Sequence, residues 1–158
     1  MLAFLSMSYI THLTWEFGWL VAHNLIIDNP DSPWTFIWWA YIDGGDRRYT
    51  TANPLLLSME FLSVCNGILG AIALWLFVYS KSKKSVLLMA ATSVIHLYSA
   101  LLYYLTEVLE GFPNVAPSFI SFYIKFFLAN SPWVIVPWFV FWWALKRVDG
   151  NRIDEKQD

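Results

Sequence analysis

Four long apolar segments, separated by short polar ones, make up most of this chain. They cover approximately residues 2–27, 55–79, 85–109 and 117–145. A helix needs about 20 mostly apolar residues to cross a bilayer, and each segment is long enough. The pattern therefore predicts an all-α, polytopic membrane protein built as a bundle of four transmembrane helices.

The connection between the first two predicted spans, residues 28–53, is long and rich in aromatic side chains. Connections of this length are usually functional or disordered. The aromatic part predicts an amphipathic helix that lies in the membrane interface and begins near residues 31–33. In the following stretch, residues 43–49, two glycines predict a turn and Asp46 can pair with a neighbouring arginine. We expect the segment to cover one mouth of the bundle as a lid. The residues predicted for this lid or structural role are Trp39, Tyr41, Asp46, Arg47, Arg48 and Tyr49.

Ionisable side chains interrupt the first two apolar segments. His12 and Glu16 are four residues apart, so on a helix they are neighbours on one face. Glu60 lies in the second segment, with Ser63 on the same face. Ionisable groups at membrane depth are costly and are by default a functional-site hypothesis facing the bundle interior. The sequence therefore predicts two buried carboxylates and a histidine around a shared interior.

Other polar positions inside the segments have a structural explanation as well as a functional one. Asn130 and Trp133 share one face of the fourth segment, and His96 lies mid-way along the third. Polar side chains such as these commonly hydrogen-bond a neighbouring helix. Glu107 lies near the end of the third segment, where we expect it to contact water.

The composition agrees with a membrane location and excludes several classes of function. Of 158 residues, 58% are hydrophobic and 14% are charged, against roughly 25% charged in a soluble domain. The net charge of −2 and the lack of a basic stripe argue against nucleic acid as a partner. The single cysteine, Cys65, excludes an internal disulfide. No nucleotide-binding or metal-ligand motif is present in the sequence, and we predict neither a metal nor a cofactor.

The basic residues predict the orientation of the chain in the membrane. If the spans alternate, only Arg47 and Arg48 lie on one side. The opposite side carries Lys81, Lys83, Lys84, Lys146, Arg147, Arg152 and Lys156. By the positive-inside rule both termini are cytoplasmic. We expect one membrane domain over residues 1–147 and a charged cytoplasmic tail over residues 148–158.

The buried polar set suits proton transfer on an apolar substrate. His12 and Glu16 can deliver a proton and recover one, and Glu60 can act as the opposite partner or as a counter-charge. The indole of Trp133 can stabilise a cation at its ring face. This combination fits a reaction that passes through a carbocation. It also fits the binding of a lipophilic amine without catalysis.

Short stretches of the chain, in one order and covering nearly its whole length, resemble the emopamil-binding protein family, or EXPERA domain. They are His12-Leu13-Thr14-Trp15-Glu16, Trp39-Ala40-Tyr41, Gly45-Asp46-Arg47-Arg48-Tyr49, Met59-Glu60 with Ser63, Leu102-Tyr103-Tyr104-Leu105-Thr106-Glu107, and Asn130-Ser131-Pro132-Trp133 followed by Pro137. Each stretch is weak alone, and the ordered set is more specific.

The resemblance implies an activity and a set of roles. Isomerase-like members of the family move a sterol double bond from Δ8 to Δ7 by protonation, a carbocation and deprotonation, without a cofactor. The implied catalytic residues are His12, Glu16 and Glu60. The implied substrate-binding residues are Ser63, Asn130, Trp133, His96, Tyr98 and Trp15. The resemblance also implies a sterol or related polycyclic terpenoid as substrate and cationic amphiphilic amines as inhibitors. The further implied partners are membrane lipid and a second copy of the chain in a homodimer. The implied location in a eukaryote is the endoplasmic reticulum.

The chain departs from the isomerase pattern at several positions. It begins directly at the helix that carries His12, where the isomerase has one more helix, so it is either a minimal four-helix member or truncated. Ser63 stands in place of a threonine, His96 in place of a glutamine and Ala100 in place of an aspartate. The exact substrate therefore stays open. Two alternatives also stay open, an integral-membrane terpenoid cyclase that uses Glu16 as its acid and a non-catalytic sterol or lipophilic-amine binding protein.

Overall fold

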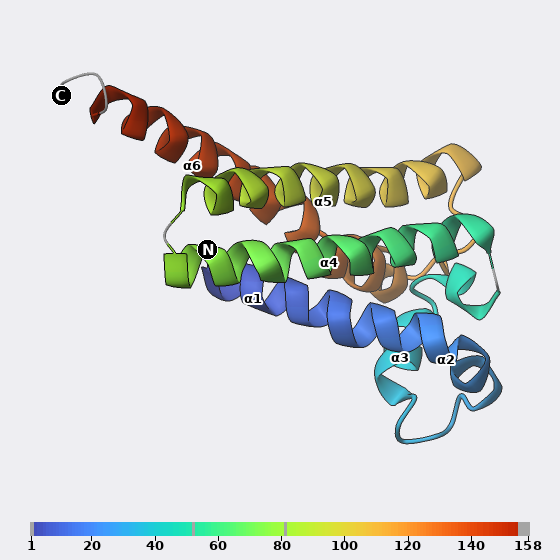
Figure 1. Cartoon of the computed structure of the whole chain (residues 1–158). Helices are drawn as coiled ribbons and strands as arrows, with labels where there is room; N and C mark the ends of the chain where they lie inside the picture. Colours follow the sequence, from blue (N-terminus) through green and yellow to red (C-terminus); the bar gives the residue numbers. More distant parts are fainter. Residues whose placement is uncertain (1, 52, 81, 155–158) are drawn as a thin grey trace.

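The computed structural model describes residues 2–51, 53–80 and 82–154, and every regular element in these ranges is helical. Three long helices form the frame: α4 (Pro54–Ser80), α5 (Lys83–Glu110) and α6 (Pro132–Asp154). Helix α5 packs against both α4 and α6, and the amino-terminal segment lies along α4 (Figure 1). The predicted all-α fold is confirmed.

Three helical stretches are long and apolar enough to cross a membrane: Pro54–Ser80, Lys83–Glu110 and Ile120–Val148. They correspond to the second, third and fourth predicted spans. The first predicted span is divided into shorter elements. These are α1 (Leu2–Thr11), the π-helical turn η1 (His12–Glu16) and α2 (Phe17–Asp28). In the described part of the chain, length and composition thus support three spans, and the first predicted span stays a prediction.

The outer surface of the frame is apolar, while polar side chains are buried within it. Phe61, Leu109 and Phe139 are among the large apolar side chains exposed on the long helices. Glu60 and His96 are buried between them. Extended apolar patches are unusual on monomers in water, and they mark contact with another protein or with a membrane. The distribution of polarity therefore supports a membrane protein.

Local signals in the sequence fix the ends of α4 and α5. The side-chain oxygen of Asn53 accepts a hydrogen bond from the backbone N–H of Leu55 at 2.9 Å. Pro54 occupies the first helical position of α4, where the missing N–H of proline has no consequence. Helix α5 ends at Glu110, and the next residue, Gly111, has a φ of 79° in the left-handed region that favours glycine.

Glycines on α4 allow the amino-terminal segment to approach closely. A Cβ atom at Gly67 would lie only 2.7 Å from the Cβ atom of His12, and one at Gly70 would overlap the ring of Tyr9. Small residues at helix contacts commonly serve this purpose in membranes. Gly70 therefore allows α1, and Gly67 allows η1 with His12, to pack closely against α4.

The connection between α2 and α4 contains two short helices, α3 (Phe36–Ile42) and η2 (Arg47–Thr50), at one end of the bundle (Figure 1). Helix α3 begins later than the predicted start near residues 31–33. The indole N–H of Trp39 donates to the carbonyl oxygen of Ile26 at 2.8 Å, and that of Trp38 donates to the backbone of η1 at 3.1 Å. The connection is thus fastened to the amino-terminal segment.

The final segment consists of the π-helical η3 (Ile120–Leu128) and α6, which continues beyond Arg147 to Asp154. The helix therefore extends into the region predicted as a charged tail. Lys81 and Lys156, two of the residues used to predict the orientation, lie outside the described residues, as do residues 155–158 in general.

Candidate active site

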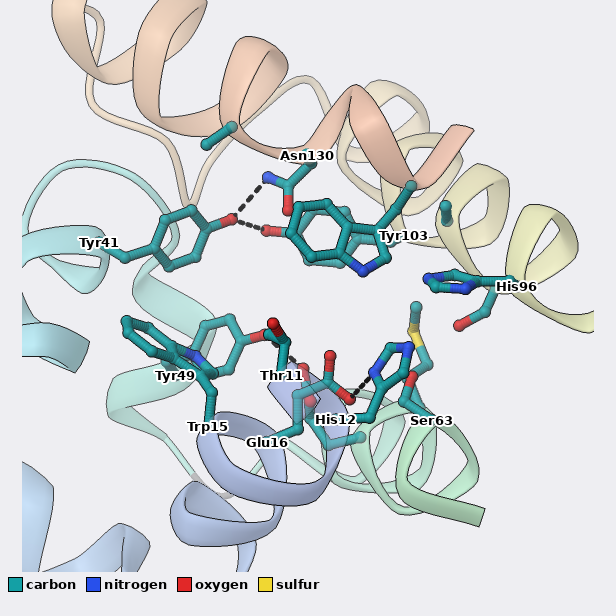
Figure 2. A pocket seen from close by; sticks show the side chains of 16 residues that line it. Thr11, His12, Trp15, Glu16, Tyr41, Tyr49, Ser63, His96, Tyr103 and Asn130 are labelled. Carbon is teal, nitrogen blue, oxygen red and sulfur yellow. Dashed lines mark hydrogen bonds and ion pairs between the residues drawn. The ribbon is translucent and has the colours of Figure 1, made fainter. Parts of the chain in front are cut away.

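A cavity of about 300 Å³ lies between η1, α4, α5 and the beginning of α6, with side chains from α3 and η2 at one end (Figure 2). Pockets for small molecules in proteins usually have volumes of roughly 300–1,000 Å³. Many of the predicted residues line this cavity. They are His12, Trp15, Glu16, Tyr41, Tyr49, Glu60, Ser63, His96, Asn130 and Trp133. The fold therefore brings together all three residues predicted to be catalytic.

His12 and Glu16 form a direct ion pair or hydrogen bond. Nδ1 of His12 lies 2.6 Å from Oε2 of Glu16, and the two side chains are 2% and 15% exposed. On its other side, Nε2 of His12 lies 3.4 Å from the hydroxyl of Ser8. The pair lies in a π-helical turn, a geometry that is often found at functional sites. Both ring nitrogens are thus engaged, and the pair can share one proton.

Glu60 faces the cavity from α4 with one oxygen paired and one free. The phenol of Tyr49 donates to Oε1 of Glu60. Oε2 is buried and has no hydrogen-bond partner among the described residues. Burial and the nearby carboxylate of Glu60 raise the pKa of Tyr49 well above its ordinary value, so this tyrosine stays a donor. Oε2 is therefore available to a ligand.

An oriented chain of hydrogen bonds fixes the amide of Asn130. The amide nitrogen donates to the carbonyl oxygen of Phe126 at 2.6 Å and to the hydroxyl of Tyr41 at 2.9 Å. The hydroxyl of Tyr103 donates to Oδ2 of Asp46 at 2.5 Å, so in the 2.5 Å contact between the tyrosines the hydrogen comes from Tyr41. Burial and the charge of Asp46 raise the pKa of Tyr41 above its ordinary value. The carbonyl oxygen of Asn130 consequently points toward the cavity (Figure 2).

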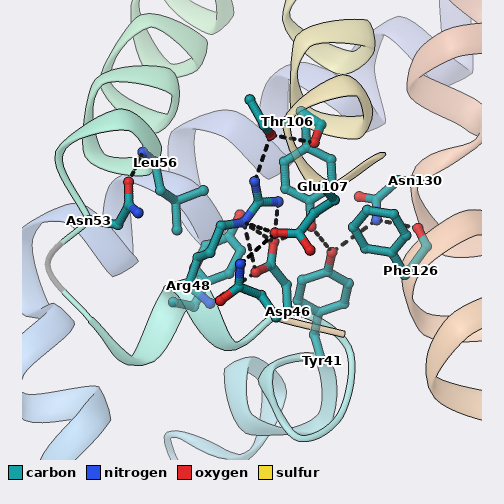
Figure 3. A network of polar contacts seen from close by, with 12 residues as sticks. Tyr41, Asp46, Arg48, Asn53, Leu56, Thr106, Glu107, Phe126 and Asn130 are labelled. Carbon is teal, nitrogen blue, oxygen red and sulfur yellow. Dashed lines mark hydrogen bonds and ion pairs between the residues drawn. The ribbon is translucent and has the colours of Figure 1, made fainter. Parts of the chain in front are cut away.

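This series of hydrogen bonds leads through Asp46 to a buried cluster of charged side chains between η2 and α5 (Figure 3). Arg48 binds Oδ2 of Asp46 through Nη2 at 2.7 Å and contacts Oε1 of Glu107 through Nε at 3.2 Å. The predicted pairing of Asp46 with an arginine is confirmed. The prediction that Glu107 contacts water is wrong, because its side chain is 0% exposed. Glu107 is buried because Arg48, from a distant part of the sequence, reaches it.

Some predicted residues lie away from the cavity. Tyr98 is 69% exposed on the outside of α5, and Arg47 is exposed on η2. Trp39 fastens α3 to α2 and does not line the cavity. Conversely, Tyr103 lines the cavity although it was not among the predicted site residues. Its position seven residues after His96, on the same face of a helix, is the sequence signal that identifies it.

Comparison with known proteins gives the family. The profile of EXPERA, the expanded EBP superfamily, matches residues 33–144. The chain belongs to the EXPERA family. The matched region contains Glu60, Asn130 and Trp133, whereas His12 and Glu16 precede it. The family resemblance noted in the sequence is thereby confirmed.

The similar EXPERA proteins carry names of two kinds. The chain is 29% identical over 150 residues to 3-beta-hydroxysteroid-Delta(8),Delta(7)-isomerase from Cavia porcellus, covering 92% of this chain and 64% of that protein. It is 30% identical over 153 residues to protoglabretal synthase from Citrus sinensis, covering 94% of this chain and 70% of that protein. It is also 35% identical over 100 residues to isomeliandiol synthase from Ailanthus altissima, covering 63% and 47%. The chain thus spans less than two thirds of the length of the isomerase.

Proposed function

We propose that this EXPERA protein is an isomerase that moves a carbon–carbon double bond, of the Δ8 to Δ7 type, in a sterol or a related polycyclic terpenoid. The observation that carries the proposal is the convergence of His12, Glu16 and Glu60 from two elements on one cavity inside an apolar bundle. Groups on two sides of a bound hydrocarbon can serve both ends of a proton transfer. Similarity to proteins named as sterol isomerases supports the same class of reaction.

In the proposed reaction one proton enters the substrate and one leaves. The His12–Glu16 pair gives a proton to one carbon of the double bond, and the π electrons form the new C–H bond. The other alkene carbon becomes a cation. Oε2 of Glu60 then takes a proton from the next carbon, and the electrons of that C–H bond form the new double bond. Electrons are neither gained nor lost overall, so the balance requires no redox partner.

The carbocation would be stabilised by fixed dipoles rather than by a full counter-ion alone. The amide dipole of Asn130 directs its negative end, the carbonyl oxygen, to the cavity. The hydrogen bonds from the amide nitrogen to Tyr41 and Phe126 set this orientation. Trp133 supplies an aromatic ring, whose face attracts cations. Groups that are already oriented stabilise a developing charge strongly where water is excluded. We expect cationic amphiphilic amines to bind the same groups and to inhibit.

A terpenoid cyclase is the second candidate, favoured by similarity to proteins named as synthases. It would begin with the same protonation and differ in what the carbocation does next. Incubation of the purified protein with a Δ8 sterol in deuterated water separates the candidates. An isomerase moves the double bond and leaves deuterium at the protonated carbon. A cyclase leaves that sterol unchanged and converts a linear or epoxidised substrate, while a binding protein returns the sterol unlabelled.

Replacing Glu60 tests the residue that we assign as the base. General acid–base groups contribute roughly 10²–10⁴-fold to rate, so Glu60→Gln should reduce turnover by that factor while sterol is still retained. Glu110→Gln, at the exposed end of α5, is the matched control and should keep full activity. Full activity in Glu60→Gln would remove Glu60 from the mechanism.

We also propose that α1, η1 and α2 together form a fourth span. Four spans place both termini on the same side of the membrane, which is the cytoplasmic side by the positive-inside rule. The segment lies along α4, and Val21 and Leu25 are among its exposed apolar side chains (Figure 1). Single cysteines at Leu2 and Thr50, on either side of this segment in a protein with Cys65 replaced by alanine, should react with a membrane-impermeant maleimide from opposite sides of sealed vesicles. Reaction of both from the same side would contradict the four-span arrangement.

A further inference from the structure

His96 presents an unused hydrogen-bonding atom at the cavity. Its side chain lines the cavity from α5 and is 7% exposed (Figure 2). The Nε2 atom is buried and has no hydrogen-bond partner among the described residues. An unpaired polar atom in an apolar interior is unfavourable, so a native example requires an explanation. A ligand atom that completes the bond is such an explanation.

The neighbouring imidazole does not pair with His96. The rings of His12 and His96 pack with centroids 4.7 Å apart and planes tilted by 54°. Nδ1 of His12 is bonded to Glu16, and its Nε2 lies 3.4 Å from the hydroxyl of Ser8. Both nitrogens of His12 are therefore turned to other partners, which leaves the free atom of His96 beside the proton-handling pair.

Trp133 adds a second unpaired atom to the same cavity. Its Nε1 is buried and has no hydrogen-bond partner in the described part of the chain. An indole N–H can only donate, whereas a neutral imidazole nitrogen donates or accepts according to its tautomer. A ligand that satisfies both atoms must therefore offer an acceptor, and an oxygen of a hydroxyl, carbonyl or ether does so.

We infer that His96 and Trp133 form an oxygen-binding subsite, and that the preferred substrate carries an oxygen function close to the reacting double bond. This inference rests on the proposed function and narrows its substrate class. The contact between the rings of His96 and His12 places the subsite next to the group that delivers the proton. An oxygen held there lies near the carbon that is protonated, and it also fixes which face of the ring system meets the acid.

Two sterols that differ in one oxygen test the inference. The probes are a Δ8 sterol with a hydroxyl on a ring carbon adjacent to the double bond and the same sterol without that hydroxyl. Their dissociation constants are measured by competition with a radiolabelled Δ8 sterol on the purified protein. We expect the wild type to prefer the hydroxylated probe by roughly tenfold, as one or two additional hydrogen bonds would give.

Variants locate that preference in the two side chains. His96→Leu should bring the ratio of the two constants close to one, and His96→Gln, which keeps a hydrogen-bonding group, should retain part of it. Trp133→Phe keeps an aromatic face without the N–H and should also reduce the ratio. His23→Leu is the matched control, because His23 lies on α2 outside the cavity, and its ratio should equal that of the wild type.

The outcomes separate this inference from the proposed function. Isomerisation of both probes with equal affinity, or a preference that His96→Leu and Trp133→Phe both leave intact, overturns the subsite and leaves the isomerase standing. If neither probe is bound or converted, both the oxygen-binding subsite and the proposed isomerase function are overturned. If His96→Leu does not fold, His96→Gln and Trp133→Phe decide the matter.

Discussion

Arg48 is the cation of the buried cluster, and its removal is expected to destabilise the fold strongly. Asp46 and Glu107, its two anionic partners, are each 0% exposed. Arg48→Met keeps a long apolar side chain in the same space but leaves two carboxylates buried without the guanidinium. The hydrogen bond from Nη1 of Arg48 to the hydroxyl of Thr106, at 2.8 Å, is lost as well.

The expected magnitude follows from that imbalance of charge. Removing one partner of a buried ion pair costs about 3–5 kcal/mol, because the other charge stays buried without compensation. Near the middle of that range, about 4 kcal/mol, the unfolding temperature of a chain of this size falls by roughly 8–16 °C. Tyr103 adds to the loss, since the guanidinium carbon of Arg48 lies 4.6 Å from the centre of its ring.

Thermal unfolding in one detergent, followed by circular dichroism of the helices, measures the effect. Arg47→Met is the matched control, because the neighbouring arginine is exposed and surface changes usually alter stability by less than about 0.5 kcal/mol. The double variant Asp46→Asn, Arg48→Met leaves one carboxylate instead of two and should recover part of the loss. If Arg48→Met and Arg47→Met unfold within about 2 °C of each other, the cluster contributes no net stability and the reasoning is wrong.

Tyr49 and Gly67 provide three further tests. Tyr49→Phe removes the donor to Glu60 and should lower kcat by roughly tenfold with a smaller change in KM, whereas a kcat within twofold of the wild type contradicts the role. Because burial raises the pKa of Tyr49 above its ordinary value of 10.0, its contribution is intact below about pH 10 and falls above it by about 1.4 kcal/mol per pH unit. Tyr49→Phe should therefore show a shallower fall in unfolding temperature between pH 10 and pH 11 than the wild type. Gly67→Ala places a Cβ atom 2.7 Å from that of His12, so we expect a loss of about 1–3 kcal/mol in thermal scans together with reduced turnover.

The parts of the site that depend on local spacing could be predicted from the sequence. His12 and Glu16 are neighbours because residues four apart share a helical face, and the contact survives the π-helical turn. Tyr98 shows the limit of reasoning from proximity alone. It is only two residues from His96, but successive residues rotate by about 100° around a helix, so it lies on nearly the opposite side. The correct companion on that helix is Tyr103.

Contacts between distant segments could not be predicted in the same way. Glu107 lies in the last turn of the apolar helix α5, four residues before Gly111, a position that is typical of a hydrated helix end. Its burial depends on Arg48, which η2 directs back into the bundle, and on Asn114, whose amide donates to Oε1 at 2.7 Å. The turn that achieves this begins with Asp46, whose carboxylate accepts the backbone N–H of Arg48 at 2.9 Å. Only the folded chain shows that these groups meet.

Contact with the buried Arg48 distinguishes the carboxylates with a structural role from the one that we assign to proton transfer. Asp46 and Glu107 both form ion pairs with Arg48, and neither side chain lines the cavity. Glu60 is also buried, but its hydrogen-bond partner is the phenol of Tyr49, and among the described residues it forms no ion pair. Its second oxygen faces the cavity unpaired. Proton transfer to or from a substrate in this cavity is therefore expected at Glu60 and at the His12–Glu16 pair, and not at the two carboxylates that share the arginine.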